Sequence, residues 1–197
     1  HIGLATLKAT NILILLMAIA FTLTFVSSPA VSYLGFSTIG LLQGQVWTLI
    51  TAPFIHVGVI HLAGNMFFLY VFGNALEEEI GARKTIELFF LGGAISLLIG
   101  IPFYPPNTHI VGSSIAVSAL VAAIIVIKPS KWSPIFRSPL GLVAVVYFIY
   151  NAFMIYYGQS GAIAYISHVI GFIVGIPLGL AWRRKGERKP DKDAVIR

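Results

Sequence analysis

The sequence predicts an all-α membrane protein folded as a bundle of six transmembrane helices. Three observations support this fold class. The 197 residues are 57% hydrophobic and only 10% charged, their mean hydropathy is +0.90, and the apolar residues form runs long enough to cross a bilayer. Soluble domains carry about 25% charged residues, so this chain is too apolar to be one.

The first predicted span covers residues 11–26. It has the shape of a signal peptide, but the sequence after it is a poor cleavage site, so we expect it to be retained. Because the sequence begins at His1 without a methionine, its native start is expected to be missing. The uncharged, Trp-bearing residues 27–56 are expected to form a loop partly in the membrane interface.

Five further apolar runs complete the bundle, and charged or proline-rich segments separate most of them. We expect spans at residues 57–76, 86–103, 110–128, 140–157 and 162–182. Residues 1–182 would then form one membrane domain, and residues 183–197 a basic cytoplasmic tail.

The distribution of charge predicts the orientation. With six spans, all 13 Lys and Arg residues fall on the same side as both termini, and the opposite loops carry no formal charge. The positive-inside rule makes that side cytoplasmic, in a multi-pass protein of the cell membrane. The net charge of +6 therefore marks the inner membrane face, and no nucleic-acid partner is expected. The absence of cysteine excludes disulfides and thiolate chemistry.

Polar residues cluster at one predicted depth. The second, fourth and sixth spans all run inward, and near their outer ends stand His61 and Asn65, Gly112 and Ser114, and His168. We expect each to lie one to two turns inside its helix. Polar groups at this depth usually face a bundle interior or a hydrated cavity, so the sequence predicts a polar site in the outer half of the bundle.

Small residues predict that two of these spans touch. They recur every four positions, as Ser114, Ser118 and Ala122 on the fourth span and as Gly171, Gly175 and Gly179 on the sixth. Such stripes allow close helix contact. His168 lies three residues before Gly171, so contact between the stripes would bring its imidazole towards Ser114.

This inventory permits a serine nucleophile activated by histidine. Imidazole can accept the serine proton at neutral pH, whereas all seven Asp and Glu residues lie on the predicted inner side. A Ser114/His168 dyad is therefore the arrangement available. Asn65, His61 and the backbone N–H groups opening the fourth span lie at the right level to stabilise an oxyanion.

Other interpretations were weighed at these positions. Serines in spans often serve helix packing alone. Ser113 could replace Ser114 as nucleophile, but a turn of about 100° points it away from the glycine stripe. Asn74 and Asn151 are expected to be helix-packing amides. Tyrosines near the fifth span, at positions 147, 150, 156 and 157, are expected in the interface belt or core.

A metal site is the remaining chemical alternative. Four outer-side imidazoles could contribute ligands: His56, His61, His109 and His168. No HExxH pairing or outer carboxylate accompanies them. We therefore expect no metal and no cofactor.

Three separated motifs resemble the rhomboid family of intramembrane serine proteases. They are Trp47, Thr51 and Phe54 ahead of HxxxxHxxxN at His56, His61 and Asn65; GxS at Gly112 and Ser114; and HxxGxxxG at His168, Gly171 and Gly175. The positions of Phe72-Gly73, Glu77 and Gly81 also resemble the family's second-span exit. The resemblance covers roughly residues 40–180.

The resemblance implies a role for each site residue. Ser114 would be the nucleophile and His168 its general base, and Asn65, His61 and the Ser114 amide would form the oxyanion hole. His56 would be a structural or hydrogen-bonding partner. The family pattern further implies that substrates carry small or helix-weakening residues at the cut, and that the fifth span or the turn at residues 158–161 moves to admit them.

The chain departs from the family pattern at three positions. Thr48 follows the loop tryptophan where the family usually has Arg, and Ile115 follows the serine where glycine is usual. Ser118 stands where a tyrosine often stacks on the catalytic imidazole. These changes concern the loop and the imidazole's surroundings, and none removes a reacting group.

The sequence thus predicts a protease that hydrolyses peptide bonds in or near the transmembrane segments of membrane-protein substrates. Its partners would be those substrates and the lipid bilayer. The alternative is a non-catalytic member of the same fold that binds or escorts transmembrane clients. A channel is disfavoured because the polar residues stop at half depth.

Overall fold

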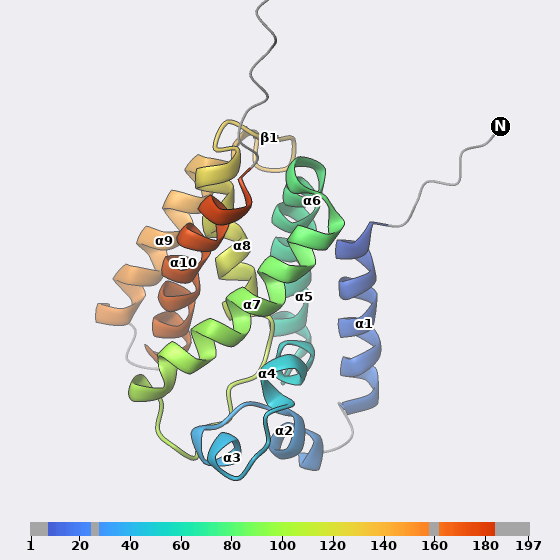
Figure 1. Ribbon diagram of the computed structural model, residues 1–197, viewed down its shortest axis with the longest axis vertical. Helices are drawn as coiled ribbons and strands as arrows, with labels where there is room; N and C mark the ends of the chain where they lie inside the picture. The colour runs from blue at the N-terminus through green and yellow to red at the C-terminus, as the bar shows by residue number, and fades with distance from the viewer. Residues whose placement is uncertain (1–7, 25–27, 158–161, 184–197) are drawn as a thin grey trace, which may run out of the picture.

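The computed structural model describes residues 8–24, 28–157 and 162–183 as a bundle of helices with one small hairpin (Figure 1). Its elements in chain order are α1 (Ala9–Thr24), α2 (Ser28–Leu34), α3 (Thr38–Leu42), α4 (Thr48–Thr51), η1 (Ala52–Phe54), α5 (Val59–Phe68), η2 (Leu69–Gly73), α6 (Asn74–Ile80), α7 (Ala82–Gly100), η3 (Ile101–Phe103), α8 (Ser114–Ile127), β1 (Trp132–Ser133), β2 (Ser138–Pro139), α9 (Leu140–Tyr157) and α10 (Ala162–Trp182).

Four helical stretches among the described residues are long and apolar enough to cross a membrane. They are Val59–Ile80, Ala82–Phe103, Leu140–Tyr157 and Ala164–Trp182. α1 with 16 residues and α8 with 14 are apolar but shorter. The chain is thus a helical membrane protein in which four of the six predicted spans reach full length.

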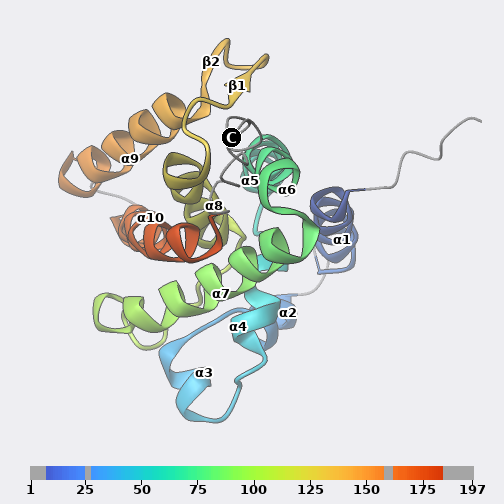
Figure 2. The same cartoon turned by 45° about the horizontal axis from the view of Figure 1, so that its top comes forward.

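α8 is the centre of the bundle. Residues 115–124 are buried without interruption, as expected of a helix that is apolar on all sides. It is enclosed by α5, α7, α9 and α10 (Figure 2). A helix in this position can set the place of side chains at its N-terminal end with little freedom.

Glycine brings α10 into direct contact with α8. A Cβ added at Gly171 would overlap the carbonyl of Ile115, and one added at Gly175 would overlap that of Ala119. The prediction that these two helices touch through the glycine stripe of α10 is confirmed. On α8 the nearest atoms include those of Ile115, Ser118, Ala119 and Ala123, so Ser118 is the one residue of the predicted α8 stripe that they include. This contact places the N-terminal half of α10, with His168, against the start of α8.

The largest difference from the sequence-based prediction lies before α8. We expected a span from residue 110, but residues 104–113 are not helical and α8 begins at Ser114. The apolar residues here are used for pairing instead, because Phe36 and Ile110 exchange backbone hydrogen bonds of 3.0 and 2.7 Å and Gly112 N–H donates to Ala52 O. The expectation that Ser114 lies inside its helix is therefore wrong: it is the first residue.

The segment from residue 28 to 54 was expected to be a loop, and it contains α2, α3, α4 and η1 at one end of the bundle (Figure 1). Side chains hold these short helices to one another. The Trp47 indole N–H donates to Tyr33 O at 2.9 Å, and the Thr51 hydroxyl to Leu34 O at 2.7 Å. Such contacts between residues 14 and 17 positions apart leave no local periodic signal.

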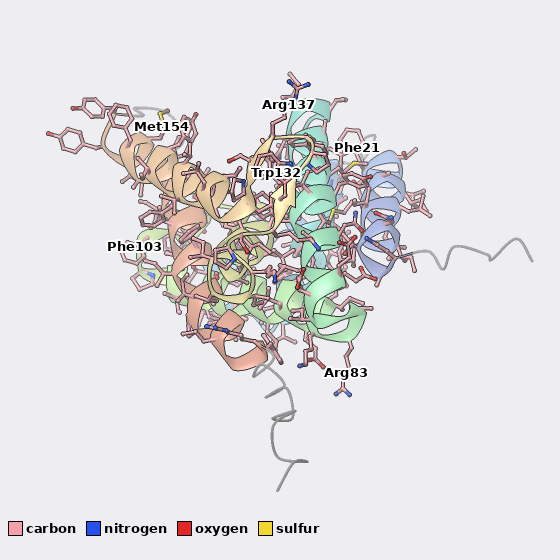
Figure 3. All side chains as sticks on the ribbon, turned by 90° about the horizontal axis from the view of Figure 1, so that it is seen from above. Phe21, Arg83, Phe103, Trp132, Arg137 and Met154 are labelled. Carbon is pink, nitrogen blue, oxygen red and sulfur yellow. The ribbon has the colours of Figure 1, made fainter. Side chains whose placement is uncertain are left out.

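Charged residues hold the opposite end together. The Glu77 carboxylate accepts hydrogen bonds from the backbone N–H groups of Ala9 and Thr10, which open α1. Glu78 pairs with both Lys8 and Lys131. Figure 3, a view along the bundle from this end, shows Arg83 and Arg137 projecting outward. The predicted tail lies outside the described residues except for Arg183, as does the turn at 158–161.

Candidate active site

A cavity of about 790 Å³ lies between α5, α8, α9, α10 and the segment preceding α8. Its wall includes four of the predicted site residues, Ser114, His168, His61 and Asn65. They come from three helices, α8, α10 and α5. The structure therefore brings together an alcohol, two imidazoles and an amide. The two imidazoles, of His61 and His168, are 107 positions apart in the sequence.

The other predicted site residues lie behind this wall. Gly112 packs against the His61 ring, and His56 is buried next to Ser113. Gly171 and Gly175 form the contact between α10 and α8 described above. These four positions shape the site, and the cavity lining does not include them.

A glycine turn delivers Ser114 to the cavity. Gly112 has φ +98°, a conformation that non-glycine residues rarely adopt. A Cβ there would also stand 2.6 and 2.7 Å from the Cε1 and Nε2 atoms of His61. Glycine is thus required twice, by backbone conformation and by space, and the turn can place Ser114 at the cavity edge as α8 begins.

Ser113 and Ser114 are in different surroundings. The Ser113 side chain is fully buried, its Oγ has no hydrogen-bond partner among the described residues, and it does not line the cavity. The Ser114 side chain is partly exposed in the cavity. Of the two neighbouring alcohols, Ser114 is therefore the one that a molecule in the cavity could reach.

His56 holds the turn from behind. Its Nδ1 lies 3.3 Å from Phe54 O, and its Nε2 lies 3.5 Å from the backbone nitrogen of Ser113. Burial, with a smaller contribution from the charge of His61, lowers the pKa of His56 to about 4. At neutral pH the ring is uncharged, so Nδ1–H can donate to Phe54 O while Nε2 accepts from Ser113 N–H.

His168 is held by α9. Its Nδ1 lies 2.7 Å from Oδ1 of Asn151, an amide with 2% of its surface exposed. The rings of Tyr147 and Tyr165 lie beside the imidazole, each with its centroid 6.3 Å away. The Asn151 contact occupies Nδ1 and leaves Nε2 as the ring nitrogen available to the cavity.

Ser114 and His168 share the cavity without a direct bond. Among the described residues, no hydrogen bond joins the Ser114 hydroxyl to the His168 ring. Hydrogen bonds between a nucleophile and its base are often long before a substrate is bound. The arrangement provides the two groups in one chamber, and a bound substrate would have to complete their alignment.

Asn65 and His61 line the cavity from α5. The Asn65 Nδ2 group donates one hydrogen to His61 O at 2.9 Å, which leaves its second N–H without a use inside α5. The His61 ring lies against Gly112 and 5.1 Å, centroid to centroid, from the His56 ring. Both groups are close to the turn that carries Ser114.

Two polar residues at this site, Asn151 and Tyr147, were not identified from the sequence, and a third, Ser118, was noted there only for helix packing and as a departure from the family pattern. Asn151 was assigned to helix packing and Tyr147 to the interface belt or core, yet both lie on His168. Ser118 donates to Ser114 O at 2.7 Å and its hydroxyl lies 2.8 Å from that of Tyr147. Tyr147 and Asn151 are four residues apart and so share one face of α9; that spacing was the available signal.

The imidazoles do not form a metal-binding cluster. Among the described residues, no three His, Asp or Glu side chains are grouped as a set of metal ligands. His109 lines the cavity separately, and His56 and His61 face each other edge to face.

The fold and the site define the class of this protein as a helical membrane protein with a cavity between its helices, in whose mostly apolar wall lie Ser114, His168, His61 and Asn65. The family model described as the rhomboid domain matches residues 43–185, most of the chain. The chain therefore belongs to the rhomboid family.

Curated relatives agree with this assignment and differ in their stated activity. Rhomboid-like protease 1 of Toxoplasma gondii is 26% identical over 149 residues, 75% of this chain and 51% of the relative. Rhomboid-like protein 11, chloroplastic, of Arabidopsis thaliana is 32% identical over 139 residues, 66% of this chain and 50% of the relative. Inactive RHOMBOID-like protein 8 of Arabidopsis thaliana is 26% identical over 107 residues, 54% of this chain and 30% of the relative. The chain spans about half the length of the first two.

Proposed function

We propose that this chain is an intramembrane serine protease that hydrolyses peptide bonds in or near transmembrane segments of other membrane proteins. The observation that carries the proposal is the common cavity of Ser114, His168, Asn65 and His61. A nucleophile, a base and two hydrogen-bond donors are the groups that acyl transfer requires.

The proposed reaction proceeds in two halves. The Ser114 Oγ attacks the scissile carbonyl carbon while its proton passes to Nε2 of His168. The C–N bond then breaks, and His168 returns the proton to the leaving amine. A water molecule in the cavity attacks the acyl-enzyme, again losing its proton to His168, and Ser114 is released with its proton restored.

The oxyanion of each tetrahedral intermediate would form next to the turn that carries Ser114. The free N–H of Asn65, a ring N–H of His61 and the backbone N–H of Ser114 are the donors on this side of the cavity. They are fixed before the reaction begins, so their stabilisation of the developing charge costs no reorganisation.

We further propose six spans, with both termini cytoplasmic and the cavity opening towards the outer face. α8 covers about 21 Å at 1.5 Å per residue, less than a bilayer core of about 30 Å. It is enclosed by other helices and need not face lipid along its whole length, and the non-helical residues 104–113 precede it. The lysines and arginines of the described residues lie away from the cavity lining, as the positive-inside rule requires for this orientation.

A substrate helix could approach between α5 and α9. A second, apolar groove of about 460 Å³ lies there and shares Phe68, Tyr147 and Tyr150 with the cavity wall. Because its surface is hydrophobic, a transmembrane segment could lie in it without exposing polar backbone. Residues with weak helix propensity at the cut would unwind into the cavity.

The alternative is a non-catalytic rhomboid protein that binds or escorts transmembrane clients. The relative named as inactive shows that the family includes inactive members. The two functions predict different chemistry at Ser114, because only a protease needs a reactive alcohol in the cavity.

Labelling with a serine-directed fluorophosphonate separates them. We expect a single adduct on Ser114 and cleavage of a transmembrane reporter in liposomes, both abolished in Ser114→Ala and strongly reduced in His168→Ala. Ser113→Ala is the matched control, because it removes the neighbouring alcohol that does not line the cavity. Reporter cleavage by Ser114→Ala at the wild-type rate would disprove the proposal.

A further inference from the structure

We propose that Asn151 of α9 is a positioning residue for His168 and completes a serine–histidine–asparagine triad. This inference rests on the function proposed above. The amide oxygen would hold the Nδ1–H of the imidazole and thereby keep Nε2 unprotonated and directed at Ser114. The contact that carries the proposal is the 2.7 Å separation of His168 Nδ1 and Asn151 Oδ1.

The orientation of the Asn151 amide is determined by its other partner. Its Nδ2 group donates to Tyr147 O at 2.8 Å, one turn earlier on α9. A carbonyl only accepts hydrogen bonds, so the nitrogen must face Tyr147 and the oxygen must face His168. An amide oxygen in turn can only accept, which places the imidazole proton on Nδ1.

This tautomer is the one that a base at Nε2 needs. A neutral imidazole carries one proton, so a proton held at Nδ1 leaves the Nε2 lone pair free. An amide performs this function beside a catalytic histidine in cysteine proteases of the papain type. In a low-dielectric bundle a neutral amide also avoids the large cost of burying an unpaired carboxylate.

The described groups around His168 include no carboxylate that could compete with Asn151 for Nδ1. α5 contributes His61 to the cavity, α9 contributes Tyr147, and α10 contributes Tyr165. α8 contributes the hydroxyl of Ser114, and the cavity lining includes no Asp or Glu. Asn151, only 2% exposed, is the one described residue with a hydrogen bond to the ring.

The contact also links catalysis to the position of α9. Among the four long apolar helices α9 has the smallest buried share, 22% against 39–44% for the others, and Met154 near its end stands well away from the bundle centre (Figure 3). A hydrogen bond of 2.7 Å is lost when its partners separate by about 1 Å. The imidazole would therefore be oriented only while α9 rests against α10.

The test compares three variants of the full chain in detergent or liposomes. Asn151→Leu removes the acceptor at similar volume, and Asn151→Asp keeps an acceptor but adds charge. Asn74→Leu is the matched control, because Asn74 makes the same bond to a carbonyl four residues earlier, Tyr70 O, and lies outside the cavity lining. Asn151→Ala replaces the leucine variant where leucine does not fold.

Four readouts distinguish orientation from packing. They are kcat and KM for a transmembrane reporter, the rate of fluorophosphonate labelling at Ser114, the pH profile, and the imidazole ¹⁵N spectrum of His168 in a Ser114→Ala background. We expect Asn151→Leu to lower kcat and labelling about ten- to a hundredfold, part of the 10²–10⁴ that general-base catalysis supplies. KM should not change, and Asn74→Leu should match wild type.

Asn151→Asp should retain more activity than Asn151→Leu. On acidification it should lose activity at a higher pH than wild type does, because a carboxylate stabilises the imidazolium. The nitrogen spectrum should show the Nδ1–H tautomer in the parent protein and a mixture in Asn151→Leu. Equal kcat for Asn151→Leu and wild type, or equal losses with an unshifted acid limb for the leucine and aspartate variants, would overturn the proposal.

The spectrum separates this proposal from the proposed function. A chain that neither cleaves the reporter nor labels at Ser114 would disprove protease activity and leave the tautomer measurable. A His168 spectrum that is unchanged by Asn151→Leu would then disprove the positioning role as well.

Discussion

The hydroxyls of Tyr147 on α9 and Ser118 on α8 lie 2.8 Å apart, and the Tyr147 ring lies beside the His168 imidazole. In the family pattern, a tyrosine next to the imidazole often comes from the position that Ser118 occupies here. In this chain a tyrosine ring reaches the same imidazole from a different helix, and the small serine makes room for its hydroxyl. A tyrosine ring is therefore present beside this imidazole although position 118 is a serine.

The Tyr147–Ser118 contact should contribute measurably to stability. Buried hydrogen bonds are worth about 1 kcal/mol net, so a double-mutant cycle of Tyr147→Phe and Ser118→Ala should give a coupling energy of about 0.5–1.5 kcal/mol in reversible unfolding in mixed micelles. Because phenylalanine keeps the ring beside His168, the rate of labelling at Ser114 should change by less than about threefold, as expected for the loss of one neutral hydrogen bond. Fully additive losses of stability would show that the two hydroxyls do not interact.

Gly112→Ala should lower turnover in addition to its effect on the free energy of unfolding. The positive φ costs an alanine about 1–2 kcal/mol, and the added methyl would displace the His61 ring from the oxyanion side of the cavity. Gly44→Ala is the matched control, because Gly44 also has a positive φ of +89° but open space around its Cβ position.

Reporter cleavage and unfolding should be measured for both glycine variants. We expect similar losses of stability and a loss of turnover only in Gly112→Ala. Equal turnover of the two variants would show that the space beside His61 does not matter for the reaction.

Acid should loosen the turn that carries Ser114. The folded-state pKa of His56 is lowered from its ordinary 6.5 to about 4, so between these values the unfolded chain binds more protons than the folded one. Its contribution to stability is therefore complete above pH 6.5 and is lost progressively as the pH falls towards 4. Protonation would also place an Nε2–H against the N–H of Ser113.

Unfolding at pH 7 and pH 5 tests this expectation. Wild type should be less stable at pH 5, and His56→Gln should show a smaller difference between the two conditions. His109→Gln is the control, because His109 lines the cavity but makes no contact with the turn among the described residues. The same pH dependence in His56→Gln as in wild type would assign the acid sensitivity to another group.

Periodicity and composition predicted most of the helical framework. Long apolar runs form span-length helices wherever local periodicity determines the structure. The glycine stripe of α10 predicted its contact with α8 because glycines have no side chain and so allow any neighbouring helix to approach closely. The depth argument likewise placed His61, Asn65 and His168 near one another, since each lies towards the N-terminal end of its long helical stretch.

Pairing between distant segments could not be predicted in this way. Ile110 and Val111 are as apolar as any helical residue, but Ile110 bonds to Phe36, 74 positions earlier by subtraction of the two numbers. That choice sets the start of α8 at Ser114. The contact of Asn151 with His168 was missed for a related reason, because a helix-packing amide and an imidazole partner cannot be told apart in the sequence until the two helices are placed together.

Asn65→Ala tests the oxyanion side of the cavity. Removing one oxyanion donor typically lowers kcat by about 10²–10³. We expect Asn65→Ala to lower kcat by roughly ten- to a thousandfold. KM should change little, because the charge exists only in the transition state. The folded state should lose only the bond from Nδ2 to His61 O. Ser96→Ala is the control, because it removes a comparable bond to a carbonyl four residues earlier on α7, away from the cavity.

The fluorophosphonate adduct gives a second measure of the same donor. Its phosphoryl oxygen would occupy the position of the oxyanion, so labelling of Ser114 should slow in Asn65→Ala in parallel with kcat, while binding of a non-reactive substrate peptide stays constant. If cleavage and labelling both proceed at the wild-type rate, Asn65 does not stabilise the intermediate. The His61 ring and the Ser114 amide would then have to stabilise the oxyanion alone. In that case His61→Ala, and not Asn65→Ala, should lower kcat by the amount given above.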